Sequence, residues 1–162
     1  MKREWIRLGI KLGLTATALV FVLNLCFGLR INYGNFAWPS VRDGDLVIYR
    51  IWGRRSPEPG QLAVYRDGEE IRVARVIAAQ AGQSVDITAQ GVLVDGSILA
   101  EEAVFPTDPD SVSTDLPLTL QEGEVFLLHD YRSDDRDSRT LGPVPAEDLL
   151  GTVVLVIRWR GF

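Results

Sequence analysis

The feature that most constrains this chain is an uncharged apolar segment near its N-terminus. Residues 12–29 form 18 consecutive positions without an acidic or basic side chain. A helix needs roughly 20 mostly apolar residues to cross the hydrocarbon of a bilayer, so this segment is just long enough to span it. With Trp5 and Lys11 placed to lie at one interface, we expect a single transmembrane anchor over residues 12–30.

The charges around this segment predict its orientation. Four basic residues precede the segment and only Arg30 follows it: Lys2, Arg3, Arg7 and Lys11. Cytoplasmic flanks carry an excess of basic residues, so we expect residues 1–11 in the cytoplasm and residues 31–162 as an extracytoplasmic domain of a single-pass cell-membrane protein. A cleaved signal peptide is the alternative. The apolar segment is long for one, and no small-x-small pair follows it.

The composition of the remaining chain excludes several kinds of partner. The 162 residues carry a net charge of −5, and 21 of the 22 acidic residues lie from residue 31 onward. A nucleic-acid partner would require the opposite sign, whereas an acidic domain is compatible with basic or neutral polypeptide partners. One cysteine, Cys26, and one histidine leave only carboxylates as further metal ligands. We therefore expect no metal site and no small-molecule cofactor.

Short apolar runs separated by Gly, Pro and Asp turns predict an all-β domain. The expected strands cover residues 46–51, 62–65, 71–77, 85–87, 92–94, 124–128 and 152–159, and one helical turn is expected at residues 145–150. This pattern favours coiled antiparallel sheets or a partly open barrel, joined to one N-terminal transmembrane helix.

Four stretches, in order along the chain, resemble the conserved boxes of type I signal peptidases, serine peptidase family S26. They cover residues 35–49, 60–65, 73–83 and 129–139. The family's first signature runs Ser-Met-x-Pro-Thr-Leu-x-x-Gly-Asp, and five residues fall in register with it: Pro39, Ser40, Val41, Gly44 and Asp45. The resemblance covers nearly the whole chain and implies the signal peptidase fold.

The resemblance fails at the positions that carry the family's chemistry. It implies a serine nucleophile, a neutral lysine base and a second serine, whose positions here hold Phe36, Ala74 and Asp135. The chain therefore resembles a homologue without the Ser–Lys dyad, like the signal-peptidase-like pilus assembly proteins of Gram-positive bacteria, and we predict no catalytic residue. For the other matching positions we expect a structural, supporting role: Pro39, Asp45, Asp130, Arg132, Asp137, Ser138 and Arg139.

The side chains that could act as a base lead to the same expectation, the absence of a catalytic residue, without the resemblance. A serine hydroxyl is a poor nucleophile until a positioned base accepts its proton. The chain has two lysines, Lys2 and Lys11, both on the expected cytoplasmic side, and arginine stays protonated. His129 is the remaining base. The alternative reading is an active type I signal peptidase with unorthodox residues, in which His129 serves Ser40, Ser133 or Ser138 beside Asp130 or Asp137.

Without the dyad, the family cleft would become an apolar peptide groove. The edges that hold an extended peptide in the family correspond to residues 31–36 and 72–77, and strand addition needs no catalytic group. The groove candidates are Tyr33, Asn35, Phe36, Ala37, Arg72, Val73, Ala74 and Arg75. We therefore predict a membrane-anchored assembly or chaperone factor for an exported polypeptide, a pilin or a preprotein. Two alternatives stay open: Phe36 plugs the cleft, or the protein is a scaffold that regulates an active paralogue.

Overall fold

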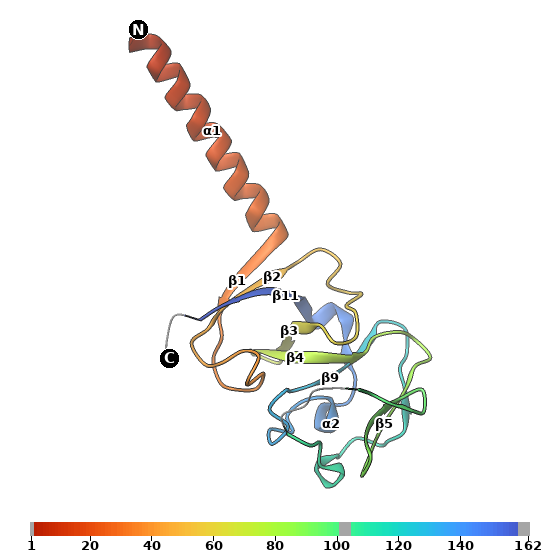
Figure 1. The fold of residues 1–162 in the computed structure, drawn as a ribbon. Coiled ribbons are helices and arrows are strands. Elements are labelled where there is room, and N and C mark those ends of the chain that lie inside the picture. The colour runs from red at the N-terminus through yellow and green to blue at the C-terminus, as the bar shows by residue number, and fades with distance from the viewer. Residues whose placement is uncertain (1, 101–104, 159–162) are drawn as a thin grey trace.

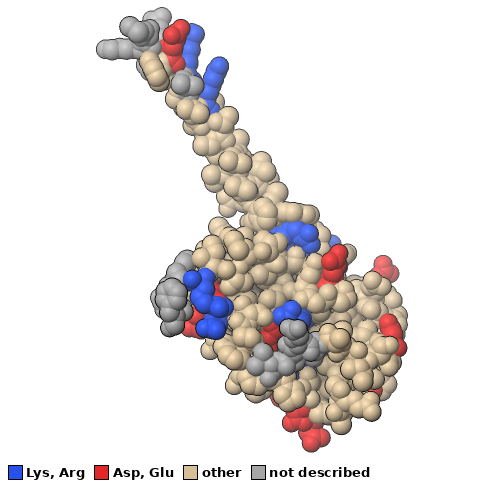
Figure 2. Space-filling view, in the orientation of Figure 1, with Lys and Arg blue, Asp and Glu red and all other residues tan. Residues whose placement is uncertain are grey.

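A long N-terminal helix stands away from a β domain that contains the rest of the chain (Figure 1). The computed structural model describes residues 2–100 and 105–158. Helix α1 (Lys2–Cys26) includes the segment Gly9–Cys26, which has a mean hydropathy of 1.7 and is long and apolar enough to cross a membrane. Figure 2 shows charged side chains at the N-terminal end of this helix and on the β domain, with an uncharged stretch between them. The expected apolar helix is therefore present.

Helix α1 ends four residues before the expected end of the anchor. Phe27–Ile31 form strand β1, which pairs antiparallel with β2 (Leu46–Arg50). Gly28 passes directly over the Tyr49 ring, so closely that a side chain at this position would collide with the ring. Residues 27–30 thus belong to the β domain, because a strand continues the apolar run that began as a helix.

Two antiparallel sheets make up the β domain. The larger sheet has the order β1-β2-β11-β3-β4-β9-β10 and the smaller one β7-β6-β5-β8. The further strands are β3 (Leu62–Asp67), β4 (Glu70–Ala78), β5 (Ser84–Thr88), β6 (Gly91–Val94), β7 (Ser97–Ile98), β8 (Leu118–Thr119), β9 (Glu124–Leu128), β10 (Val144–Pro145) and β11 (Leu149–Ile157). The prediction of an all-β domain with coiled antiparallel sheets is confirmed, and the sheets do not close into a barrel.

Short helical turns connect these strands. They are η1 (Pro109–Ser111), α2 (Ser138–Leu141) and η2 (Ala146–Asp148). The turn expected at residues 145–150 is η2, and no helical turn was expected at α2. The expected end of the last strand, residue 159, lies outside the described residues.

Strand β4 occupies the centre of the larger sheet and is buried on both faces. It pairs with β3 from Glu70 to Arg75 and with β9 from Arg75 to Ala78. Ala74 and Val76 pack into one core cluster with Tyr65, whereas Ile77 packs into another, toward the smaller sheet. A strand buried on both faces carries a nearly continuous apolar run, as residues 73–79 do.

The outer face of the sheet next to α1 is apolar and exposed. The register aligns Leu29 of β1 and Leu155 of β11 on either side of Ile48, and these two leucines are 65% and 52% exposed. Trp52, at the end of β2, packs edge-on against Phe27 at the start of β1. Strands β1, β2 and β11 lie at the end of the β domain from which α1 emerges (Figure 1).

Candidate functional site

The turn after β1 presents the Phe36 side chain, and backbone hydrogen bonds fix this turn on both sides. The Asn32 side chain donates to the carbonyls of Gly34 and Arg42, at 2.8 and 3.1 Å. The Phe36 carbonyl accepts a hydrogen bond from the backbone N–H of Tyr131 at 3.0 Å. This last bond joins the turn to the loop of residues 129–137, so the family's first and last boxes meet at Phe36.

Three charged or titratable side chains surround the Phe36 ring. The His129 ring lies 5.1 Å from it, centroid to centroid, with an interplanar angle of 32°. The guanidinium carbons of Arg72 and Arg136 lie 5.2 and 5.3 Å from the ring centroid. Cations this close to an aromatic ring are attracted by its quadrupole, by about 0.5–1 kcal/mol each where exposed. Phe36 is therefore held in place between two elements, β4 and the loop after β9.

His129 is fully buried and hydrogen-bonded to another ring. Its Nε2 lies 3.2 Å from the Tyr65 hydroxyl, and its Nδ1 is 3.6 Å from Asp134 and 4.0 Å from Asp137. Burial lowers the pKa of the His129 imidazole, and the two carboxylates only partly offset this effect. Burial likewise raises the pKa of the Tyr65 hydroxyl. The pair is therefore uncharged at neutral pH.

The other two positions that the resemblance aligns with the family's chemistry, Ala74 and Asp135, lie in different surroundings. Ala74 is fully buried among Tyr65, Leu127 and Leu149, opposite Ala63 of β3. Asp135 is half-buried, and its carbonyl accepts a hydrogen bond from the Thr140 hydroxyl at 2.8 Å. Within residues 2–100 and 105–158, the Asp135 carboxylate makes no hydrogen bond. The Ala74 methyl thus belongs to the core and does not line a cleft.

A buried ion pair organises the loop that follows β9. The Asp137 carboxylate accepts hydrogen bonds from the backbone N–H of His129 at 2.8 Å and from the Arg139 guanidinium at 2.8 and 2.9 Å. Arg139, fully buried, also donates to the carbonyls of Arg132 and Asp134. The Ser138 hydroxyl accepts from the backbone N–H of Leu127 at 3.0 Å. These contacts tie the loop to β9.

A second polar cluster forms around Ser40, the one serine of the first box (residues 35–49). The Ser40 hydroxyl donates to Asp130 at 2.6 Å, and Arg75 donates to the same carboxylate at 2.6 and 2.7 Å. Among the described residues, no hydrogen bond joins the His129 ring to a serine. Ser133 is exposed. The arrangement of Ser40, His129 and Asp130 therefore differs from a hydrogen-bonded triad, in which one histidine contacts both partners.

The remaining supporting residues also make structural contacts. Asp45 accepts hydrogen bonds from the backbone N–H of Arg42 and from the Arg158 guanidinium, both at 2.9 Å. Arg132 donates to the Thr107 hydroxyl at 3.0 Å, and Pro39 follows a cis peptide bond. In residues 2–100 and 105–158, no group of three or more His, Cys, Asp or Glu side chains is placed to hold a metal ion.

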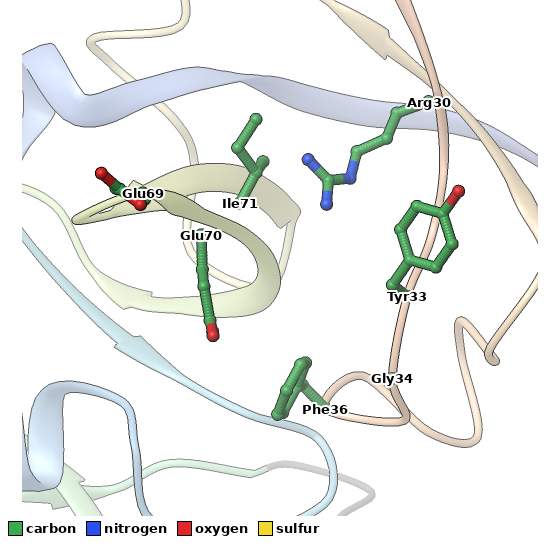
Figure 3. A pocket seen from close by; sticks show the side chains of 7 residues that line it. All are labelled: Arg30, Tyr33, Gly34, Phe36, Glu69, Glu70 and Ile71. Atoms are coloured by element: carbon green, nitrogen blue, oxygen red, sulfur yellow. The ribbon is translucent and has the colours of Figure 1, made fainter.

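An open pocket of about 410 Å³ lies between the segment after β1 and the start of β4 (Figure 3). It is lined by Arg30, Tyr33, Gly34, Phe36, Glu69, Glu70 and Ile71. Strand β9 pairs with β4 only from Arg75 onward, so residues 70–74 have no strand partner on that side in the described part of the chain. Arg72, Val73 and Ala74 are buried, so the pocket combines aromatic side chains with a short stretch of β4, the exposed Glu70 and the half-buried Ile71.

The groove candidates from the sequence fall into separate places. Tyr33 and Phe36 line the pocket, and Arg72 contacts Phe36. Asn35 lines a second pocket, of about 330 Å³, with Trp38, Phe105 and Tyr131. The others lie elsewhere: Ala37, Val73 and Ala74 in the core, and Arg75 beside Asp130.

The sequence did not predict two walls of the pocket, Arg30 and residues 69–71. It placed Arg30 in the anchor, and it began the second groove edge at Arg72, which left out Glu69, Glu70 and Ile71. The hairpin turn at Asp67-Gly68 is the signal that could have extended this edge, because it fixes where β4 begins.

Comparisons with known proteins agree with this fold. A signal peptidase I from Enterococcus faecalis superposes with a TM-score of 0.50 at 22% identity, covering 61% of this chain and 97% of the other. The family model for signal peptidase, peptidase S26, matches residues 2–159. The chain therefore belongs to the signal peptidase S26 family, as the four boxes predicted.

Three relatives span different shares of this chain. The probable signal peptidase I-1 of Synechocystis is 28% identical over 163 residues, covering 91% of this chain and 81% of the relative. The plasmid transfer protein TraF of Escherichia coli is 30% identical over 121 residues, covering 62% and 67%. The probable thylakoidal processing peptidase 2 of Arabidopsis thaliana is 26% identical over 128 residues, which is 72% of this chain. The chain spans about a third (34%) of that chloroplast protein.

Proposed function

We propose that this protein is a membrane-anchored member of the signal peptidase family that binds an exported polypeptide without cleaving it. The observation that carries the proposal is the contact between Phe36 and His129. The apolar Phe36 ring stands at the position aligned with the family's nucleophile, and it packs against His129, the one histidine of the chain. The function is then assembly or chaperoning of the bound polypeptide.

The available groups support the absence of amide hydrolysis. Lys11 lies in α1, about 22 Å along the helix axis from Cys26 at a rise of about 1.5 Å per residue, and Lys2 lies further away. Arginine cannot act as a base at neutral pH. His129 is hydrogen-bonded to Tyr65, and the Ser40 hydroxyl is bound to Asp130. The Ser40 hydroxyl and the His129 imidazole are therefore each bound to another group and do not form a nucleophile–base pair.

The exposed start of β4 beside the pocket supports peptide binding. An extended polypeptide can lie against Glu70 and Ile71, with side chains reaching the pocket between Tyr33 and Phe36. The relatives carry the names of signal and processing peptidases and of a plasmid transfer protein, which supports an exported chain, a preprotein or a pilin, as the ligand.

Photocrosslinking in cells tests this binding. A photoreactive phenylalanine analogue replaces Tyr33 at the pocket, and the matched control replaces Gln90, which is exposed in the smaller sheet. We expect the Tyr33 position to crosslink an exported polypeptide of unchanged length, and the Gln90 position to give no such product. Equal crosslinking at both positions, or none at Tyr33, would contradict the proposal.

The membrane placement extends the same proposal. Helix α1 spans the membrane with residues 1–11 in the cytoplasm, and the apolar outer face around Leu29 and Leu155 lies against the extracytoplasmic lipid surface. A polarity-sensitive dye on a cysteine at position 155, in a Cys26→Ser chain, should report a less polar environment in lipid nanodiscs than the same dye at position 90. Equal environments at the two positions would refute this placement.

The alternative is an active type I signal peptidase with unorthodox residues, and the peptidase names of the relatives favour it. In that case, the Ser40 hydroxyl would have to leave Asp130 and the His129 ring would have to leave Tyr65. Ser40 and His129 would then have to approach within hydrogen-bonding distance of each other. Loss of a specific cleavage in Ser40→Ala or His129→Gln chains would support it.

A further inference from the structure

We propose that the pocket beside Phe36 binds a carboxylate of the polypeptide and that Arg30 is the ion partner of this carboxylate. The inference rests on the proposed function, because the bound polypeptide supplies the carboxylate. It adds a chemical preference: the recognised chain carries an acidic side chain or a free C-terminus where it meets Arg30.

Arg30 extends from β1 into the pocket. It pairs in register with Val47, whose side chain is buried, whereas its neighbours Leu29 and Ile31 are exposed on the outer face. In Figure 3 its guanidinium extends between Tyr33 and Ile71 into the open space of the pocket. Alternation along the strand therefore directs this one charged side chain of β1 inward.

The Arg30 guanidinium lacks a partner within the described part of the chain. Its Nε is buried without a hydrogen bond, and no carboxylate oxygen lies within 4.0 Å of its nitrogens in residues 2–100 and 105–158. A buried donor without an acceptor is unfavourable, and a planar guanidinium pairs best with a carboxylate, which can accept two of its hydrogen bonds at once.

The other arginines around the site already have carboxylate partners. Arg72 pairs with Glu70 at 2.7 Å and with Asp67 at 3.1 Å, and Arg136 pairs with Asp134 at 2.9 Å. Among the arginines around this pocket, Arg30 is therefore the one that the described residues leave free to pair with a ligand.

The acidic residues on the opposite wall do not neutralise Arg30. The Glu70 carboxylate is held by Arg72 and points toward Phe36, and the Glu69 carboxylate points away from Arg30 (Figure 3). The Tyr33 and Phe36 rings form apolar walls that can contact the aliphatic part of an acidic side chain. A volume of about 410 Å³ is sufficient for one such side chain or for the end of a peptide.

Selection of random peptides tests this preference. The full-length chain in nanodiscs is the target, and 12-residue peptides are displayed in two formats, one internal and one with a free C-terminus. We expect selected internal peptides to share Asp or Glu at one position, or selection to succeed only with a free C-terminus. The first result assigns the carboxylate to a side chain and the second to the chain end.

Substitutions on both sides of the contact complete the test. On the protein, Arg30→Gln should weaken binding of a selected peptide about 10- to 100-fold, the usual effect of losing a charge-assisted hydrogen bond. On the peptide, Asp→Asn or amidation of the C-terminus should have the same effect. Arg30→Lys should retain part of the preference. Arg50→Gln is the matched control, because it removes the same charge from the next strand, on the outer face where Arg50 lies 5.6 Å from the Trp52 ring centroid. It should leave binding unchanged.

The possible outcomes separate this inference from the proposed function. Selected peptides without acidic groups, or equal affinity for the wild-type and Arg30→Gln chains, would overturn the carboxylate preference and leave peptide binding intact. Failure to select any peptide in either format would overturn both. The amidated and Asp→Asn peptides keep the test decisive even if Arg30→Gln unfolds the chain, because they leave the protein unchanged.

Discussion

The Phe36 ring lies 5.1 Å from the imidazole ring of His129, and the motif resemblance aligns Phe36 with the nucleophile of signal peptidases. One aromatic side chain therefore has two effects. In that alignment it stands where a hydroxyl is expected, and it packs against the buried ring of His129. The properties of His129 consequently depend on Phe36, and this dependence can be measured.

Phe36→Ala should raise the pKa of His129. Burial lowers this pKa in the folded chain, and removal of the ring lets water reach the imidazole while Asp137 and Asp134 continue to favour its protonated form. Because the chain has one histidine, an NMR titration of its ring protons gives this pKa without ambiguity. Phe105→Ala is the control, since Phe105 packs against Trp38 and, edge-on, against Tyr131. A pKa in Phe36→Ala equal to that of the wild type would contradict the shielding.

The buried neutral histidine should also make the β domain less stable in mild acid. The folded-state pKa of His129 lies below its usual 6.5, so the unfolded chain binds more protons between these two values. The free energy of unfolding should therefore fall as the pH drops below about 6.5, by at most about 1.4 kcal/mol per pH unit.

Carboxylates should contribute only at lower pH. Burial raises the pKa of Asp45 and of Asp134, but hydrogen bonds from Arg158 and Arg136 outweigh it and keep both below the usual 3.8. Urea unfolding at pH 7.5, 6.5 and 5.5 measures the contribution of His129 to the pH dependence of the free energy of unfolding. In the His129→Gln chain, this free energy should change little over the same range. A wild-type profile that stays flat over this range would refute the prediction.

Ala74→Lys should destabilise the domain. Because Ala74 is fully buried next to Tyr65 and Leu127, a lysine would overfill the core and bury an amine, at a cost of at least about 2 kcal/mol. Urea unfolding measures the loss, and Ala89→Lys, at an exposed turn between β5 and β6, should change stability by less than about 0.5 kcal/mol. Equal stability of the two variants would mean that position 74 opens into a cleft.

Asp137 and Asp135 differ by two positions but should respond very differently to substitution. Asp137→Ala leaves the buried Arg139 without its ion partner and should cost about 3–5 kcal/mol of unfolding free energy. Asp135→Ala removes a carboxylate without hydrogen bonds in the described chain and should cost less than about 0.5 kcal/mol. The two variants are compared by thermal and urea unfolding. Similar losses would contradict the structural role assigned to Asp137.

The family and seven of the strands were predictable from the sequence, because apolar runs and turn residues mark these strands; β1 and the two-residue strands β7, β8 and β10 were not predicted. The end of the helix was not, since the apolar residues of α1 continue into β1 and hydropathy does not distinguish the two. This error hid Arg30 from the candidate site.

The contacts of the site were harder to predict than its residues. Phe36, Ala74 and Asp135 stood out as departures from the family pattern. Their surroundings depend on pairings between distant segments, such as the bond from Ser40 to Asp130. Ala74 was expected in a groove, but the central position of β4 between β3 and β9 buries it.

Incubation with a precursor tests the central claim most directly. The purified full-length chain in nanodiscs is mixed with a radiolabelled, signal-peptide-bearing exported precursor, alongside an active signal peptidase as the positive control. We predict that the precursor is retained by the chain and stays intact while the control cleaves it. Cleavage at one defined bond by the wild-type chain, lost in Ser40→Ala or His129→Gln, would contradict the account.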